Sequence, residues 1–311
     1  MKSRGSSVIG VDENGLGSRL GPMTVTGVRV AMDEGTDAKK RKVAEALRAA
    51  GIGDSKALCA HGAMGSVERV VLSMLDVHLG VQPASLDALT ERFGLENATA
   101  LKLPCPSGEA SQVCFGQDIA LPAFGGSITD ASRREAAALD KLGFSLRDVR
   151  ISVRCAGVLN DARAIGQSRF DVDLASMCAL LAVLAEGHAP VRAVLGKVGA
   201  RSKYTEILAQ RFALVRTDEE RREVSRYNIA ALGTVHFVMD GDASEPTISL
   251  ASMFGKYARE LWMRRHNQYW QQAVEGLHPV SGYHDPVTDR LVRATALVRK
   301  TRAIPQRCFE R

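Results

Sequence analysis

Two adjacent carboxylates, Asp12 and Glu13, stand where a short apolar run ends and a glycine-rich turn begins. Neighbouring side chains of a strand point to opposite faces, so both reach one site only where the strand ends and the backbone turns. Glycines in such a turn let a ligand approach the backbone closely. Carboxylate oxygens are the ligands that Mg²⁺ and other hard cations prefer. The pair therefore indicates a hard-metal site, and the alternative is an acidic turn that is simply solvated.

The residues around this pair predict a β-hairpin. Residues 8–11 form an apolar run, and residues 23–32 alternate between apolar and polar side chains, as expected of two strands around the turn. Helices are expected over residues 37–50, from the N-cap Ser66 onward, and over 171–184, 204–212 and 248–270, with strands over 191–195 and 236–239. A hairpin followed by alternating helices and strands, and then by a helical C-terminus, is typical of a mixed α/β sheet.

Composition limits the class of protein. The chain has 311 residues, of which 45% are hydrophobic, enough for one large domain or two small ones. A formal net charge of +6 favours a polyanionic partner, although a charge of this size also serves solubility alone. The six cysteines form no C-x-x-C pair, so we expect reduced thiols in the cytoplasm. Neither a signal peptide nor an apolar stretch long enough to span a membrane is evident.

Four sequence blocks, the first of which contains the Asp12-Glu13 pair, follow one another along the chain. The first reads V-D-E-N-G-L-G over residues 11–17 with Gly21-Pro22 after it, and the second reads D-S-K-A-L over 54–58. The third joins Gly241-Asp242 to S-L-A-S-M-F-G-K over 249–256, and the fourth reads S-G-Y-H-D-P-V-T over 281–288. Together they resemble the ribonuclease HII family (type 2 ribonuclease H), nearest its archaeal and eukaryotic branch. The four blocks and the segments between them that match the family pattern make up about two thirds of the chain.

The resemblance implies a fold and an activity. The expected fold is a ribonuclease H-like mixed sheet flanked by helices, with a core over residues 1–260 and a basic, helical C-terminal extension over 261–311 packed on the core. Residues 86–156 match poorly and are expected to be an insertion. The implied reaction is hydrolysis of the RNA strand of an RNA/DNA hybrid, or cleavage at a ribonucleotide embedded in DNA, with Mg²⁺ or Mn²⁺ held by four carboxylates. We expect a monomer.

By the same resemblance, Asp12, Glu13 and Asp242 correspond to three of the four metal-binding, catalytic carboxylates. Gly15 and Gly17 would lie in the turn that reads the 2′-hydroxyl, which distinguishes RNA from DNA, and Tyr283 would stack on the ribose. The remaining nucleic-acid contacts that the resemblance implies are Lys56, Ser252, Lys256 and Arg307.

The chain departs from the family pattern at two positions. Gly196 stands where the fourth carboxylate is expected, and no Asp or Glu occurs between Pro190 and Tyr204. Lys197 beside it would place an ammonium where a cation binds, which would repel Mg²⁺. Leu16 replaces an arginine of the turn, a role that Arg19 could fill. The substitutes considered for the missing carboxylate are Asp171, Asp173 and Glu206.

Three hypotheses follow for the function. The first, which we favour, is a divergent metal-dependent endoribonuclease with a substitute fourth ligand. The second is a catalytically weakened or silent relative that binds RNA/DNA hybrids without cleaving them. The third is an α/β protein with an acidic turn and no nucleic-acid role. The preferred metal, and the choice between a long hybrid and a single ribonucleotide, stay open at this point.

Overall fold

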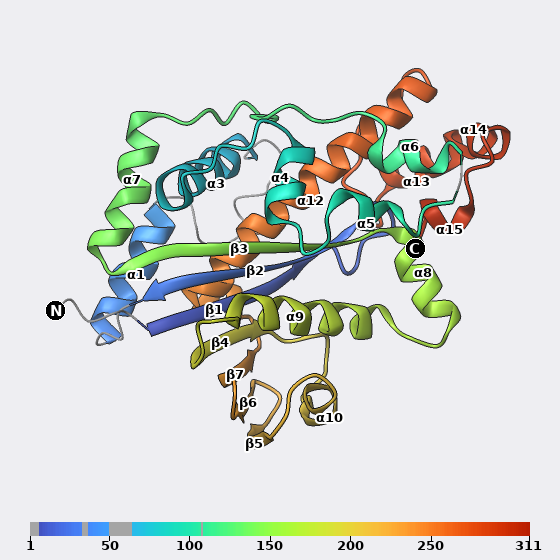
Figure 1. Ribbon diagram of the computed structural model, residues 1–311. Coiled ribbons are helices and arrows are strands. Elements are labelled where there is room, and N and C mark those ends of the chain that lie inside the picture. The colour runs from blue at the N-terminus through green and yellow to red at the C-terminus, as the bar shows by residue number, and fades with distance from the viewer. Residues whose placement is uncertain (1–5, 33–36, 50–63, 107) are drawn as a thin grey trace.

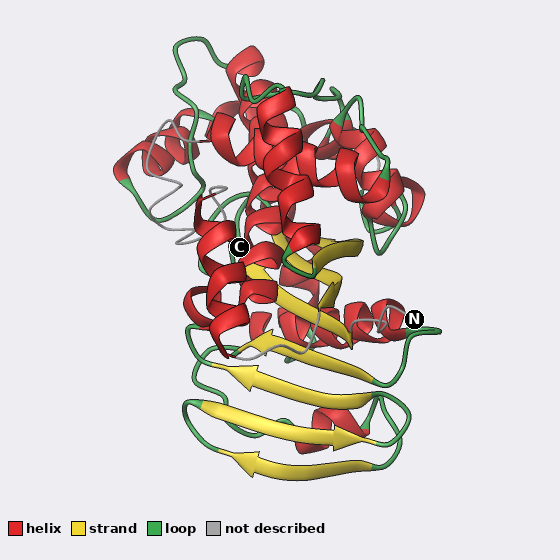
Figure 2. Cartoon of the chain, turned by 90° about the vertical axis from the view of Figure 1, so that its left-hand side faces the viewer, coloured by secondary structure: helices red, strands yellow, loops and turns green. Residues whose placement is uncertain are grey.

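The computed structural model describes residues 6–32, 37–49, 64–106 and 108–311. Its centre is a seven-stranded sheet in the order β3-β2-β1-β4-β7-β6-β5. The strands are β1 (Ser6–Asn14), β2 (Met23–Met32), β3 (Phe144–Arg154), β4 (Val191–Gly196), β5 (Val215–Glu220), β6 (Val224–Ile229) and β7 (Gly233–Val238). Figure 2 shows these strands stacked as one twisted sheet.

The sheet is mixed, as predicted. β1 and β2 form the expected antiparallel hairpin, with Asp12 opposite Thr26. β1, β4 and β7 run parallel to one another, whereas β3, β6 and β5 pair antiparallel with their neighbours. Because the three central strands are parallel, their carboxyl ends meet at one edge of the sheet.

Helices cover both faces of the sheet (Figure 1). On one face lie α12 (Pro246–Ala273), α3 (Met64–Leu79), α4 (Leu86–Phe93) and α7 (Asp130–Lys141), and on the other lies α9 (Arg169–Ala185). The remaining helices are α1 (Asp37–Ala49), α5 (Ala98–Lys102), α6 (Ala110–Phe115), α8 (Ala156–Ala164), α10 (Thr205–Ala209), α11 (Gly241–Ser244), α13 (Pro286–Ala294), α14 (Ala296–Thr301) and α15 (Gln306–Phe309). The predicted fold class, a mixed sheet flanked by helices with a helical C-terminal region, is confirmed.

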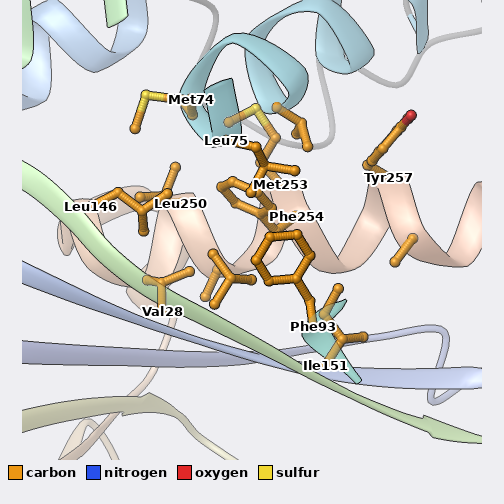
Figure 3. Packing of buried hydrophobic residues seen from close by; sticks show 14 of the residues in the cluster. Val28, Met74, Leu75, Phe93, Leu146, Ile151, Leu250, Met253, Phe254 and Tyr257 are labelled. Carbon is orange, nitrogen blue, oxygen red and sulfur yellow. The ribbon is translucent and has the colours of Figure 1, made fainter. Parts of the chain in front are cut away.

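Alternating side chains of β1 divide the core into two clusters. Val8 joins a cluster with Val28 and with Leu250 and Phe254 of α12, which Figure 3 shows in part. Ile9 and Val11 join a second cluster against α9. The alternation then directs Asp12 toward α12 and Glu13 toward the α9 side.

Three expectations about organisation differ from the structure. Ser66 lies inside α3 rather than at its N-cap, because the helix already includes Met64. The stretch 86–156, expected to be an insertion, includes β3, which pairs with β2 along its whole length and belongs to the sheet. The predicted division at residue 260 falls inside α12, which runs unbroken to Ala273.

None of the helices in the described residues is long and apolar enough to cross a membrane.

α12 approaches β1 closely at Gly10. A Cβ added there would lie 2.3 Å from the backbone carbonyl of Thr247, so only glycine fits without moving the helix. We expect Gly10→Ala to lower the free energy of unfolding by about 1–3 kcal/mol through overpacking. Gly17→Ala is the control, since a Cβ at Gly17 meets nothing within 4 Å. Urea unfolding measures both, and equal stabilities of the two variants would contradict this packing.

Candidate functional site

A cleft of about 1110 Å³ lies at the carboxyl ends of β1, β4 and β7. Its walls include the carboxylates of β1 and α11, the glycine turn after β1, one side of α12 and the segment before α13. The lining residues relevant here are Asp12, Glu13, Gly15, Gly196, Lys197, Asp242, Ser252, Lys256, Arg259 and Tyr283. The fold therefore brings together residues that are up to 271 positions apart, from Asp12 to Tyr283 (283 minus 12).

Asp12 lies within the electrostatic influence of two further carboxylates of this cleft. Burial is the main cause that raises the pKa of Asp12 to about 7, and the charges of Glu13 and Asp242 add to it. The Ser252 hydroxyl opposes this shift by hydrogen bonding to Asp12. Burial also raises the pKa of Glu13, whereas the backbone N–H of Leu16, which donates to Glu13 Oε2 at 3.0 Å, lowers it. The cleft thus holds concentrated negative charge that a cation would neutralise.

Gly196 faces this cluster directly. A Cβ added at Gly196 would lie 2.8 Å from Asp12 Oδ1, so a side chain at this position would enter the carboxylate group. The Lys197 side chain does not donate to these carboxylates. Its ammonium donates to the Arg221 carbonyl at 2.7 Å and to Ser225 Oγ at 2.8 Å. The expectation that Lys197 places its charge at the cation position is therefore not supported, because that charge is held beside β6.

The three candidate substitutes for the missing carboxylate lie in different places. Asp171 caps α9 together with Ser168 and pairs with Arg201 at 2.9 Å. Glu206 is exposed and lies outside the cleft lining. Asp173 is fully buried, and neither of its carboxylate oxygens has a hydrogen-bond partner among the described residues. Burial, followed by the charges of Glu13 and Asp12, raises the pKa of Asp173 well above its ordinary value. Of the three candidates, Asp173 is therefore the one on which the charges of Glu13 and Asp12 act, although it is not among the residues that line the cleft.

We expect Asp173→Asn to raise the free energy of unfolding by about 1–3 kcal/mol near pH 8. On folding at that pH, the parent chain must either bury an unpaired charge or take up a proton at Asp173, and asparagine requires neither. The folded-state pKa of Asp173 lies above its ordinary value of 3.8, so the ionised group destabilises the fold increasingly as pH rises above that value. The gain should therefore shrink as pH falls toward about 4. Urea unfolding at both pH values measures it, with the capping residue Asp171 changed to Asn as control. A gain that does not vary with pH would contradict the assignment.

Arginine side chains from other segments donate hydrogen bonds to the backbone of the glycine turn. Arg311 Nη1 donates to the Gly15 carbonyl at 2.7 Å, and Arg169 Nη1 donates to the Leu16 carbonyl at 3.1 Å. Gly15 has a φ of +86°, and a Cβ there would lie 2.3 Å from Arg259 Nε. Arg19, the expected replacement for the arginine of the turn, instead pairs with Asp289 and Glu310. The turn is therefore fixed by arginines that sequence reasoning did not assign to it.

Tyr283 forms an aromatic wall of the cleft. Its side chain is 43% exposed, and the Arg259 guanidinium lies 4.8 Å from the ring centroid. Arg259 itself is buried and donates to the Ser281 carbonyl at 2.9 Å, which ties the Tyr283 segment to α12. Such a ring can stack against a sugar or a base.

The structure does not bring every predicted residue to the cleft. Gly17 is exposed and Arg307 pairs with Asp161 at 2.7 Å, and both lie outside the cleft lining. Lys56 falls outside the described residues. Sequence reasoning does not predict the roles of Arg169, Arg259 and Arg311, although Arg259 adjoins the third sequence block and Arg311 belongs to the basic C-terminal segment.

The donor set suits a hard cation in type but not in number. Asp12, Glu13 and Asp242 offer carboxylate oxygens, which Mg²⁺ and Mn²⁺ prefer. Within residues 6–32, 37–49, 64–106 and 108–311, however, no three His, Cys, Asp or Glu side chains are already arranged to hold a metal ion. The described part of the chain thus brings Asp12, Glu13 and Asp242 to one cleft and holds no preformed four-carboxylate centre.

Comparisons with known proteins concern the fold. No protein-family model matches the chain, and no curated protein matches its sequence. Among solved structures, ribonuclease H2 from Pyrococcus horikoshii OT3 is 15% identical over 97% of this chain and 92% of that chain, with a TM-score of 0.49. RNase HII from Archaeoglobus fulgidus, solved in complex with PCNA, is 14% identical over 97% and 92%, with a TM-score of 0.46. Bst-RNase HIII in complex with Mn²⁺ is 15% identical over 99% and 67%, with a TM-score of 0.48. These values describe a distant likeness in the arrangement of sheet and helices and carry no information about the site.

Proposed function

We propose that the cleft binds the RNA-containing strand of an RNA/DNA hybrid, or of duplex DNA with an embedded ribonucleotide, and that the chain slowly hydrolyses this strand. The observation that carries the proposal is the meeting of Asp12, Glu13 and Asp242 with the Gly15 turn and Tyr283 in one cleft. Carboxylates alone would indicate only a cation site. The aromatic ring and the accessible backbone turn add the means to recognise a ribose.

Each wall of the cleft has a role in binding. The Gly15 turn would present its backbone to the 2′-hydroxyl, which is the group that separates RNA from DNA. Tyr283 would stack against the adjoining sugar or base. Lys256 lines the same cleft and would contribute positive charge toward a phosphate. The net charge of +6 is consistent with attraction of a polyanion.

The carboxylates would act on the scissile phosphate through a divalent ion. Asp12, Glu13 and Asp242 would hold Mg²⁺ or Mn²⁺, and such an ion activates water and offsets charge on the phosphate oxygens. Ser252 would fix the orientation of the Asp12 carboxylate through its hydrogen bond. Gly196 has no side-chain oxygen to serve as the fourth metal ligand, so hydrolysis should be slow. Each 1.36 kcal/mol lost from transition-state stabilisation lowers the rate about tenfold.

A second candidate function is binding without cleavage, and Gly196 favours it. Its backbone stands directly beside Asp12, where a fourth carboxylate would enter the cluster, and neither Asp171 nor Glu206 takes over that place. This alternative keeps the roles of the Gly15 turn and Tyr283 and removes only turnover.

Binding by competition tests the part that both functions share. A labelled RNA/DNA hybrid is titrated with the chain in EDTA, and unlabelled hybrid or DNA duplex of the same sequence competes for it. We expect the hybrid to compete at least about tenfold better, and the affinity to fall as salt concentration rises. Tyr283→Ala should reduce the preference for the hybrid more than the affinity for DNA. Equal competition by hybrid and DNA would overturn the proposal.

A further inference from the structure

The carboxylate cleft continues along α12 beyond the residues considered so far. Ser252, which hydrogen-bonds to Asp12, lies near the start of this helix, and Arg264 lines the same cleft further along it. An α-helix rises about 1.5 Å per residue, so the step from residue 252 to residue 264 spans about 18 Å along the axis. A duplex strand advances about 3.4 Å per nucleotide, which places Arg264 up to about five nucleotides from the carboxylates. The cleft can therefore hold several nucleotides of one strand.

The guanidinium of Arg264 is available to an anion. Arg264 is exposed, and no carboxylate in the described part of the chain pairs with it. The other two arginines of α12 are buried. Arg259 pairs with Glu260 at 2.9 Å. Arg265 pairs with Asp87 at 2.7 Å. An exposed arginine without a carboxylate partner suits a phosphate, because the planar guanidinium can donate to two phosphate oxygens at once.

An aromatic ring lies against this arginine. The Arg264 guanidinium lies 5.5 Å from the centroid of the Phe124 ring, and Phe124 lines the cleft as well. A cation–π interaction of this kind stabilises the guanidinium above the ring, and its N–H donors stay in the guanidinium plane, where an anion can accept them. The same combination occurs near the glycine turn, where Arg259 lies over Tyr283. The cleft thus has an aromatic–arginine pair at two places along α12.

A buried carboxylate fixes the loop that carries Phe124. Glu68 of α3 is fully buried. Its carboxylate accepts hydrogen bonds from the backbone N–H groups of Ala123, Phe124 and Gly126 at 2.5, 2.7 and 2.9 Å. The Tyr257 hydroxyl of α12 donates to the same carboxylate at 3.0 Å. These bonds tie the loop to α3 and α12, so the Phe124 ring is in position before a ligand binds, which lowers the entropic cost of binding.

We propose that Arg264 and Phe124 form a second nucleic-acid contact, which binds the duplex that flanks the scissile ribonucleotide. This inference rests on the proposed function, because both residues line the cleft that holds the carboxylates. Arg264 would donate to a phosphate. Phe124 would pack against a neighbouring sugar, since the bases of a duplex are stacked on one another. Phosphate contacts position a duplex without reading its sequence, so this contact should add affinity and leave recognition of the ribose to the Gly15 turn.

Two variants test the contact through binding of a labelled DNA duplex with one ribonucleotide, in EDTA. Arg264→Gln should reduce the affinity about threefold to tenfold and make the dependence of log K on log salt less steep by about 0.9, because one phosphate contact is lost. Phe124→Leu keeps an apolar side chain in the loop and should reduce the affinity about threefold to tenfold with an unchanged salt dependence. Arg134→Gln, at an exposed position of α7 outside the cleft lining, is the control and should bind as the parent chain does.

Shortening the duplex locates the contact. We expect the parent chain to lose at least about threefold in affinity when the flank on one side of the ribonucleotide is cut from about ten to about two base pairs. Arg264→Gln should lose little from the same truncation, because the variant already lacks the contact that the truncation removes. Arg264 is exposed, so this variant keeps the test valid if Phe124→Leu does not fold.

The outcomes separate this inference from the proposed function. Affinities of Arg264→Gln and Phe124→Leu equal to that of the parent chain would overturn the second contact. Losses from variant and truncation that simply add would do so too. In either case, a parent chain that still prefers the ribonucleotide duplex to plain DNA would leave the proposed function standing. A parent chain without that preference would overturn both.

Discussion

Gly196→Asp is expected to accelerate hydrolysis of a ribonucleotide-containing strand by about 100-fold to 1000-fold, a gain of about 3–4 kcal/mol in the transition state. The new carboxylate would enter the cluster beside Asp12, since a Cβ at this position lies 2.8 Å from Asp12 Oδ1. That oxygen is the far end of a flexible side chain, so a small movement of Asp12 makes room. A fourth carboxylate would complete the set that holds a divalent ion.

Single-turnover rates in Mg²⁺ and in Mn²⁺ measure this gain. Gly196→Asn is the control, because it has nearly the same size and lacks the charge. The aspartate variant should also be less stable than the parent chain in EDTA, where its carboxylate repels Asp12, and should regain stability when Mn²⁺ is added. Equal rates for the aspartate and asparagine variants would show that position 196 has no part in hydrolysis.

Asp12→Asn is expected to reduce hydrolysis by at least about 100-fold while hybrid binding in EDTA is preserved. Asparagine keeps the shape of the side chain but loses the charge that would hold a cation. Asp171→Asn is the matched control and should retain hydrolysis, since Asp171 is occupied by Ser168 and Arg201. Loss of activity in both variants would instead indicate a general structural effect.

The same variant should change how stability depends on pH. Burial raises the folded-state pKa of Asp12 from 3.8 to about 7, so ionisation of Asp12 destabilises the parent chain as pH rises through this range. Asp12→Asn should therefore be the more stable chain near pH 8 and lose that advantage near pH 4. Urea unfolding at the two pH values measures this, and a parent chain that gains stability relative to the variant as pH rises would contradict it.

The parts of the fold that the sequence predicts are those with strong periodicity. The hairpin, α9 and α12 are predicted because their apolar side chains recur at strand or helix spacing, although both faces of the hairpin and most sides of α12 prove to be buried. The sequence does not predict β5, because it is the exposed edge strand and is rich in charged residues. It does not predict β6 either, because only alternate residues of this strand are buried and one of them, Ser225, is polar. β3 was assigned to an insertion because its stretch lacks the sequence blocks.

Some residues of the candidate site are predictable from the sequence, and others are revealed only by the fold. Asp12, Glu13, Gly15, Asp242, Ser252, Lys256 and Tyr283 were named from local sequence blocks, and the fold brings all seven to one cleft. The role of Arg311 is not predicted, because an arginine of a basic C-terminal segment that donates to the Gly15 carbonyl has the same local sequence as a solvated one. Asp173 was one of three equivalent candidates, and only the packing of α9 under β1 distinguishes it. These contacts depend on tertiary packing rather than on local pattern.

The most direct measurement is cleavage of a labelled DNA duplex that carries one ribonucleotide, with the parent chain and Asp12→Asn in Mn²⁺. The account predicts slow cleavage at the ribonucleotide by the parent chain alone, with a 3′-hydroxyl and a 5′-phosphate as product ends, because water rather than the 2′-hydroxyl attacks. Equal cleavage by both chains, or a 2′,3′-cyclic phosphate end, would contradict a hydrolytic role for the Asp12 site. No cleavage together with selective hybrid binding would establish the second candidate, a binding protein.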